Sequence, residues 1–262
     1  MDNYDIIGKK YNLNRIADIR IVNLFHELLD VKRNSIICDI GAGTGNYTEK
    51  LAEMGYKIDA IEPSIQMINQ STQNKNVTWY QLRAEEINSS QKYDGAICSL
   101  AIHHFEDIDK SLSNIKRSLK KDASFIIFCA DPRKIDEDCW FKNYFNELIE
   151  KAKSTYLPLE ILLRKLEENF KSVPKVEAFR IPKNITDGFF YAGWQTPERY
   201  LNKVFRNSIS VFSKAPEEMV SKSIKNLEKD LKLGIWDLKY KNIRRMESYN
   251  GGYYFVKIKN EM

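Results

Sequence analysis

The stretch 36–62 combines residue types that could hold a small polar ligand. It begins with a short, β-branched apolar run, 36–40, which is typical of a strand that is buried on both faces. Three glycines follow at Gly41, Gly43 and Gly45, and without a Cβ they let the backbone turn sharply and approach a ligand closely. Asp39 precedes this turn, and Glu62 ends the next apolar run. A strand, a glycine turn, a helix and a second strand that ends in a carboxylate make one half of a nucleotide-binding βαβ unit.

The elements that would position this turn follow from hydrophobic periodicity and from helix-stop signals. The segment 46–54 is predicted to be a helix that Gly55 ends, and 57–61 is predicted to be the second strand. The same signals predict further strands at 77–82, 93–99 and 123–130, with helices at 65–70 and 109–119. This alternation indicates a right-handed, parallel, doubly wound α/β sheet as far as residue 131.

The glycine turn differs from the usual dinucleotide fingerprint G-x-G-x-x-G. Its sixth position is Asn46, where close packing of the helix on the strand requires Gly or Ala. Residues 39–45 instead read Asp-x-Gly-x-Gly-x-Gly, which resembles the first motif of class I S-adenosylmethionine-dependent methyltransferases, in particular the bacterial small-molecule (methyltransferase type 11-like) group. The resemblance is specific over about 34–131 and loose elsewhere. It implies S-adenosyl-L-methionine as the cofactor and S-adenosyl-L-homocysteine as the product.

The resemblance also implies which residues bind the cofactor. Glu62 would accept hydrogen bonds from both ribose hydroxyls, and Asp39 would reach the ammonium group, directly or through water. Met67 would lie under the adenine, whose exocyclic amine could donate to Glu85. Arg83 departs from the family, which more often has Gly-Asp or Ala-Asp after the third strand. The full set of expected cofactor residues is Asp39, Gly41, Ala42, Gly43, Gly45, Glu62, Pro63, Met67, Ala84, Glu85, Ser99 and Leu100.

The acceptor side of the site is expected at the tip of the fourth strand, which abuts the transferred methyl group in this family. His103 and His104 follow that tip, and a neutral imidazole could take a proton from an acceptor near pH 7. Tyr11 is a candidate second catalytic residue, and Tyr11, Arg15 and Asp131 could meet the acceptor or the cofactor carboxylate. Two alternatives stay open: the histidines could only pack and shape the pocket, and the N-terminal helix could only pack on the sheet edge.

The predicted architecture is a Rossmann-like, doubly wound seven-stranded sheet with an antiparallel last strand and a helical cap over the active site. An amphipathic helix is predicted over 14–30, with its apolar face at Ile16, Ile19, Val22, Phe25 and Leu29. Gly251-Gly252 is predicted to precede the last strand, 253–258. The expected segments are an N-terminal helical lid (1–33), a cofactor-binding core (34–131), a helical insertion (132–172), a core strand (173–183), a helical cap (184–250) and a final core strand (251–262).

Composition narrows the functional classes. The net charge is +5, and the basic excess lies in the second half, where it is too diffuse to indicate nucleic acid. The four cysteines include no C-x-x-C pair and histidine is scarce, so we expect no metal and reduced cytoplasmic thiols. No apolar run approaches the length of a membrane span. Aromatic residues gather at 140–145 and 189–194, where they could wall a pocket or simply pack a cap.

The leading interpretation is a methyltransferase that acts on a nitrogen or oxygen atom of a small molecule or small peptide. An RNA or tRNA methyltransferase is an alternative, although 99–102 lacks the Pro-Pro-aromatic motif of amino-group methylases. A non-catalytic cofactor-binding regulatory protein is a further alternative, and Asn46 argues against a nicotinamide dehydrogenase. The sequence leaves the acceptor, the use of a general base and the oligomeric state open.

Overall fold

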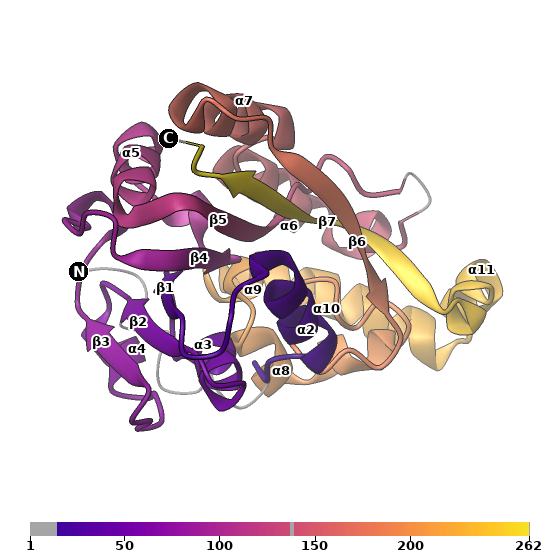
Figure 1. Ribbon diagram of the computed structural model, residues 1–262. Helices are drawn as coiled ribbons and strands as arrows, with labels where there is room; N and C mark the ends of the chain where they lie inside the picture. Colours follow the sequence, from indigo (N-terminus) through magenta and orange to yellow (C-terminus); the bar gives the residue numbers. More distant parts are fainter. Residues whose placement is uncertain (1–14, 137–138, 262) are drawn as a thin grey trace.

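A seven-stranded sheet runs through the computed structural model, which describes residues 15–136 and 139–261 (Figure 1). The strands are β1 (Ile36–Ile40), β2 (Lys57–Ile61), β3 (Val77–Tyr80), β4 (Tyr93–Ser99), β5 (Leu119–Ala130), β6 (Lys175–Pro182) and β7 (Ser248–Lys259). Their order in the sheet is β3-β2-β1-β4-β5-β7-β6. The first five strands are parallel, and β7 is antiparallel to both of its neighbours. The predicted fold class is therefore confirmed.

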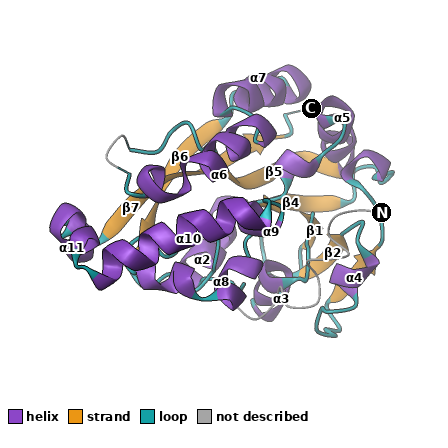
Figure 2. Cartoon of the chain, turned by 180° about the vertical axis from the view of Figure 1, so that it is seen from behind, coloured by secondary structure: helices purple, strands orange, loops and turns teal. Residues whose placement is uncertain are grey.

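Helices cover both faces of this sheet and continue into a cap. The α-helices are α2 (Ile19–Leu29), α3 (Asn46–Glu53), α4 (Ile65–Ile68), α5 (Ile108–Ser118), α6 (Phe141–Thr155), α7 (Leu159–Phe170), α8 (Lys203–Asn207), α9 (Ser210–Ser213), α10 (Glu217–Lys232) and α11 (Ile235–Tyr240). The 3₁₀ helices are η2 (Ala84–Glu86), η3 (Ile102–His104), η4 (Pro197–Leu201) and η5 (Ile243–Arg245). Helices α2 and α3 pack on one face of the sheet, and α5 and α7 pack on the other. Figure 2 shows α10 lying across the cap helices.

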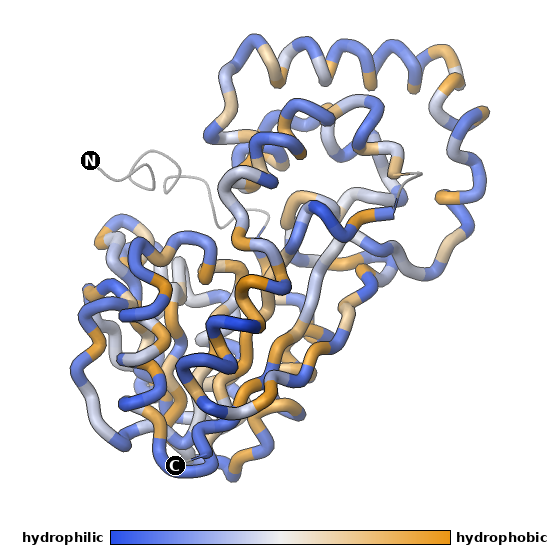
Figure 3. Tube along the Cα trace, turned by 90° about the horizontal axis from the view of Figure 1, so that it is seen from above, coloured by the Kyte–Doolittle hydropathy of each residue, from blue (hydrophilic) through white to orange (hydrophobic). Residues whose placement is uncertain are grey.

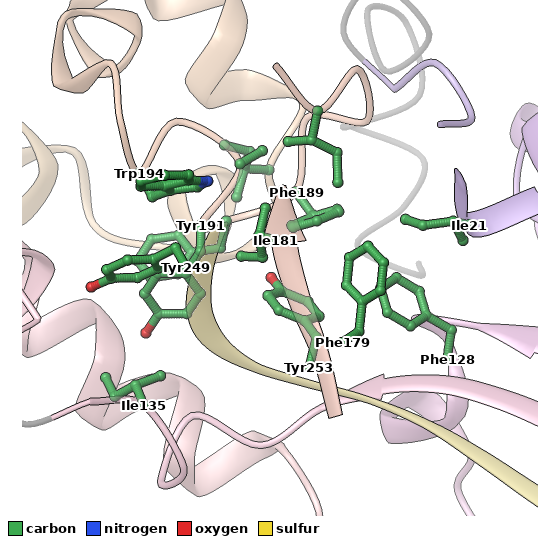
Figure 4. Packing of buried hydrophobic residues seen from close by; sticks show 14 of the residues in the cluster. Ile21, Phe128, Ile135, Phe179, Ile181, Phe189, Tyr191, Trp194, Tyr249 and Tyr253 are labelled. Atoms are coloured by element: carbon green, nitrogen blue, oxygen red, sulfur yellow. The ribbon is translucent and has the colours of Figure 1, made fainter. Parts of the chain in front are cut away.

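Each face of the sheet carries its own hydrophobic core, and β7 contributes to both. Tyr253 and Phe255 belong to the core under α2, whereas Val256 and Ile258 belong to the core under α5 and α7. This division follows from the strand geometry, because successive side chains point to opposite faces. In Figure 4, Phe128 of β5 lies beside Tyr253 of β7, and their ring centroids are 5.7 Å apart. The predicted last strand is therefore an interior strand of the sheet with two apolar faces.

The first described helix is shorter than the sequence suggested. It begins at Ile19 because the Asp18 side chain caps it, accepting a hydrogen bond of 3.0 Å from the backbone N–H of Arg20. Ile16 lies before the helix, and it and Ile19 are more than half exposed. The prediction of a helix over 14–30 with both residues on its buried face was therefore wrong. The buried face of α2 consists of Ile21, Val22, Phe25 and Leu29.

The final strand is longer than predicted. It starts at Ser248, which pairs with Pro182, so Gly251 and Gly252 lie inside β7. A Cβ at Gly252 would collide with the backbone carbonyl oxygen of Asp131, and its φ is +71°. The pair of glycines therefore marks a close approach of two backbones, which the sequence pattern read as the end of a loop.

The helices of the cap pack around a dense aromatic core. In Figure 3 they form a second mass beside the sheet. Trp140 and Phe141 stack with ring centroids 3.9 Å apart, and Tyr200 meets both rings edge-on. These rings are fully buried, so they stabilise the cap from within. Among the described helices, none combines the length and the apolar character needed to cross a membrane.

Candidate active site

A cavity opens at the carboxyl ends of the parallel strands, below the cap. It encloses about 1120 Å³ of empty space, part of it open to solvent. Loops that follow β1, β2, β3 and β4 line one side, and the cap and β7 line the other. Ligands of doubly wound sheets bind at this edge, because the loops there converge where the strand order reverses. The strand order reverses between β1 and β4, so the cavity occupies the expected position.

The glycine turn forms the floor of this cavity. Its glycines have φ values of +71° at Gly41, +60° at Gly43 and +85° at Gly45, which L side chains rarely adopt. The backbone N–H groups of Gly41 and Ala42 donate to the carbonyl oxygen of Ile61, at 2.9 and 3.1 Å. The turn is therefore fixed to the end of β2. A Cβ at Gly43 would meet no atom within 4 Å, so this glycine faces open space.

Glu62 is held against the glycine turn by its backbone. One carboxylate oxygen accepts from the N–H of Gly43 and the other from the N–H of Ser64, both at 2.9 Å. Burial raises the pKa of Glu62, and these two hydrogen bonds oppose that rise. Each oxygen keeps further acceptor capacity, as a ligand with two adjacent hydroxyls would require. Glu62 therefore lies where the sequence placed it, as a fixed, buried acceptor at the cavity wall.

Asp39 lies behind the turn and adds a second negative charge. Its carboxylate accepts a hydrogen bond of 2.5 Å from the hydroxyl of Thr48, on α3. Burial raises the pKa of Asp39 to about 7, and the nearby charge of Glu62 acts in the same direction. Two buried carboxylates this close favour a cationic ligand, because a positive charge would relieve their mutual repulsion.

The third strand and the loop after it supply a different wall. Glu85 accepts hydrogen bonds from the hydroxyl of Ser111 at 2.9 Å and from the N–H of Asp107 at 3.1 Å, so its carboxylate is oriented by the start of α5. Met67 is buried and also lines the cavity. Arg83, the departure from the family pattern, lines the cavity and forms an ion pair with Glu106.

The tip of β4 is strained and polar. Leu100 has a φ of +52°, an uncommon conformation for a bulky residue, and its N–H donates to the carbonyl oxygen of Phe128 at 2.7 Å. The adjacent Ser99 hydroxyl is buried at the cavity and finds no hydrogen-bond partner among the described residues. A buried hydroxyl without a hydrogen-bond partner destabilises the protein, so a ligand atom that forms a hydrogen bond with it would bind favourably there.

The two histidines stand side by side at the cavity. Their ring centroids are 3.9 Å apart, and His103 also stacks on Tyr156 at 4.0 Å. Burial lowers the pKa of His103 far below its usual range, and the charges of His104 and Lys214 act in the same direction. Water reaches His104 in the open cavity, but desolvation by the cavity walls and the Lys214 ammonium lower its pKa as well. Both imidazoles are therefore neutral at pH 7 and weaker bases than an isolated histidine.

Arg15 lines the cavity next to the start of α3. Its guanidinium binds the carboxylate of Asp187 through Nε at 2.5 Å and Nη2 at 3.3 Å, and the hydroxyl of Tyr47 donates to the same carboxylate at 2.8 Å. Asp187 is fully buried and lies 172 residues away in the sequence, so no local pattern could have revealed it. Tyr11, the other expected N-terminal contributor, lies outside the described residues.

The structure does not bring Asp131 to the cavity. One of its carboxylate oxygens accepts from the backbone N–H of Arg133 at 3.0 Å and from its guanidinium at 2.8 Å. The other accepts from the N–H of Leu159 at 2.9 Å, at the start of α7. Asp131 therefore fixes the chain after β5 and caps a helix, and its contact with the cofactor or the acceptor stays a prediction.

The cap contributes a wall that the sequence showed only in part. Phe189 and Phe190 line the cavity, as the aromatic group at 189–194 suggested, whereas the group at 140–145 packs inside the cap and stays away from it. No sequence pattern indicated the other cavity residues from this side, because folding brings them together from three separate segments. The residues that it missed are Tyr156, Ile209, Ser210, Val211 and Tyr253.

Most of the expected cofactor residues share this cavity. The nine that line it are Gly41, Gly43, Glu62, Pro63, Met67, Ala84, Glu85, Ser99 and Leu100. The remaining three, Asp39, Ala42 and Gly45, lie in or directly before the turn that forms its floor. The sequence pattern therefore located one coherent site, although the role of each residue in it stays a prediction.

Comparisons with known proteins agree with this geometry. The family model described as a methyltransferase domain matches residues 38–127. A crystal structure from Anabaena variabilis, described as a methyltransferase from an antibiotic biosynthesis pathway, is 36% identical, with 93% of this chain and 98% of that chain covered and a TM-score of 0.89. An uncharacterized methyltransferase of Staphylococcus carnosus is 28% identical over 145 residues, which are 53% of this chain and 70% of the relative.

A more distant structure shares the fold. Phosphoethanolamine N-methyltransferase 2 of Haemonchus contortus, in complex with S-adenosyl-L-methionine, is 17% identical, with a TM-score of 0.60. The comparison covers 99% of this chain but 56% of that one, so this chain spans little more than half of that protein.

Proposed function

Because the chain belongs to the class I S-adenosylmethionine-dependent methyltransferases, we propose that it transfers the methyl group to a nitrogen or oxygen atom of a small-molecule or small-peptide acceptor. The observation that carries this proposal is the cavity itself, whose lining joins the glycine turn and Glu62 on one side to the cap on the other. A cofactor and an acceptor could meet inside it at the tip of β4, near Ser99 and His104.

The cavity residues suit the chemistry of a sulfonium donor. S-adenosylmethionine supplies an activated methyl group on a positively charged sulfur, which leaves as a neutral thioether. The buried carboxylates of Asp39 and Glu62 favour a cationic ligand, and Arg15 could take the cofactor carboxylate at the start of α3. The protein then has to align the acceptor with the methyl group and to exclude water, and the cap is placed to do both.

The test begins with Glu62, on which the cofactor assignment rests. We expect Glu62→Ala to weaken binding of S-adenosylmethionine and S-adenosylhomocysteine by ~1.5–3 kcal/mol, the range for lost hydrogen bonds to a charged group. Isothermal titration calorimetry measures both affinities. The matched control is Glu53→Ala, which removes an exposed carboxylate that pairs with Lys50 on the outside of α3. Wild-type affinity in the Glu62 variant would refute the cofactor site.

A second measurement separates an enzyme from a binding protein. The full chain is incubated with S-adenosylmethionine and either the small-molecule fraction of a cell extract or total RNA, and S-adenosylhomocysteine is quantified. We expect formation that depends on the small-molecule fraction and falls in the Glu62 variant. Formation that depends on RNA would favour the nucleic-acid alternative. Tight cofactor binding without turnover in either mixture would favour a regulatory role.

A further inference from the structure

Charge is distributed unevenly over the wall of the cavity. Among the described residues that line it, the acidic and basic ones come from the N-terminal half of the chain: Arg15, Glu62, Arg83 and Glu85. The residues from beyond position 132 are uncharged: Tyr156, Phe189, Phe190, Ile209, Ser210, Val211 and Tyr253. An acceptor seated against the cap would therefore meet rings, methyl groups and hydroxyls, with no carboxylate on that side.

The charged groups of the cavity already have partners. Arg15 binds Asp187, which comes from the cap segment but does not line the cavity, and Arg83 binds Glu106. Both acidic residues are held by the chain: Glu62 by two backbone N–H groups and Glu85 by the start of α5. These contacts orient the two carboxylates next to the glycine turn and the loop after β3. Among the described residues that line the cavity, they leave the cap side without a counter-ion for a cationic acceptor.

Aromatic rings dominate the cap side. Tyr156 stacks on His103 with an angle of 16° between the rings, and Phe189 lies 4.6 Å from Tyr253, centroid to centroid. Such rings bind flat apolar surfaces well, because stacked and edge-on contacts add to the burial of apolar area. Their neutral neighbours at the β4 tip are the two imidazoles and the unpartnered hydroxyl of Ser99.

We propose that the acceptor is a flat, apolar, uncharged molecule that is methylated on a hydroxyl oxygen, an inference that rests on the proposed function. An ammonium group on the acceptor would lose its hydration against the cap without gaining a carboxylate, which is strongly unfavourable. A hydroxyl is desolvated at far lower cost, and an imidazole can accept its hydrogen bond. The geometry thus favours oxygen over a protonated amine.

The transfer balances with the groups present. The acceptor oxygen forms a bond to the methyl carbon while the carbon–sulfur bond breaks, and the electron pair of that bond stays on sulfur. The hydroxyl proton passes to His104 or His103, which lie at the tip of β4. Both imidazoles are unprotonated at neutral pH and can accept the hydrogen bond of the hydroxyl. Because they are weak bases, the proton passes on to the water that reaches His104, and its charge balances the one that sulfur loses.

Binding of two matched probes tests the acceptor class without turnover. The full chain is saturated with S-adenosylhomocysteine and titrated with 2-naphthol or with 2-naphthylmethylamine, which is an ammonium at neutral pH. We expect 2-naphthol to bind at least about tenfold more tightly. Any result in which 2-naphthol binds no more tightly than the amine, including no binding of either, overturns this inference. Failure of S-adenosylhomocysteine to bind would instead overturn the proposed function.

A substitution at the cap should reverse the preference. Ser210 lines the cavity as the first residue of α9, a position where a carboxylate is favourable for a helix. We expect Ser210→Asp to tighten binding of 2-naphthylmethylamine about tenfold, whereas Ser210→Asn, of similar size but uncharged, leaves its affinity unchanged. Equal effects of the two variants would contradict the inference. If Ser210→Asp does not fold, the comparison of the two probes on the wild-type protein still tests the inference.

Discussion

The two carboxylates at the glycine turn show how single residues prepare this site. Asp39 and Glu62 are both buried, and each raises the cost of ionising the other. Their hydrogen-bond donors, Thr48 for one and two backbone N–H groups for the other, offset only part of that cost. The site without its ligand is therefore electrostatically unfavourable, and a cationic ligand would relieve it.

The raised pKa of Asp39 makes the stability of the protein depend on pH. Burial raises the pKa of Asp39 from 3.8 to about 7, so between these values the native state binds a proton that the unfolded chain has released. Stability without cofactor should then fall as pH rises from about 4 to about 7, by at most roughly 1.4 kcal/mol per pH unit. Asp39→Asn cannot ionise, so this decline should be missing. Urea unfolding of both proteins at several pH values measures it, and a difference in stability that is independent of pH would contradict the assignment.

Among single residues, the sequence predicted those whose position follows from a local pattern. Asp39 and Glu62 are defined by a strand end and a glycine turn, and both lie at the site. Asp187 and Tyr156 could not be found in this way, because their positions depend on how the cap folds back over the sheet. Asp131 has a structural role that the local pattern did not indicate, because a strand tip also needs polar groups to fix the chain that leaves it.

Among the elements, the glycine turn makes the sharpest prediction. Gly43 has a φ of +60° and faces open space in the cavity, so Gly43→Val adds both backbone strain and a side chain where the ligand would bind. We expect a larger loss of cofactor affinity than for Glu62→Ala. Gly234 is a matched control, since its φ is +69° and its Cβ position is equally open, but it precedes α11, away from the cavity.

The Gly234 variant separates the steric effect on ligand binding from the effect of backbone strain. Both valine variants should lose roughly 1–2 kcal/mol of unfolding free energy, because each forces a β-branched residue into the left-handed region. Thermal unfolding measures that loss, and calorimetry measures cofactor affinity. If the Gly234 variant lost affinity as strongly as the Gly43 variant, the effect would come from strain, and the steric argument at the cavity would be wrong.

The elements themselves were predicted best where the chain alternates regularly. The fourth strand was expected at 93–99 and has those bounds, because its two buried faces produce a run of small and apolar residues at 95–98. The edges of the pattern were predicted less well. The Asp18 cap starts the helix at Ile19, five residues later than periodicity suggested, and pairing with β6 extends β7 back to Ser248. The end of β7 depends on a distant partner strand, whereas the Asp18 cap is a local feature that periodicity alone does not detect.

In the whole molecule, β7 joins parts that are far apart in sequence. It lies between β5 and β6 and pairs with both, from Ser124↔Lys259 on one side to Pro182↔Ser248 on the other. Its side chains enter the cores on both faces of the sheet, and Tyr253 also lines the cavity. The last strand therefore connects the sheet, both cores and the cap side of the cavity. We infer that the fold requires it.

Truncation tests this role. A chain that ends at Asn250 leaves β5 and β6 without their shared partner and exposes two apolar strand faces. We expect insoluble protein or a molten state, which would keep its far-ultraviolet circular dichroism but lose its near-ultraviolet signal and its cooperative thermal transition. The control ends at Asn260, whose buried side chain donates to backbone carbonyls at the start of β5, and should unfold like the full chain. A soluble product of the shorter truncation with an unchanged thermal midpoint would show that the sheet closes without β7, and the two-core architecture would then have to be abandoned.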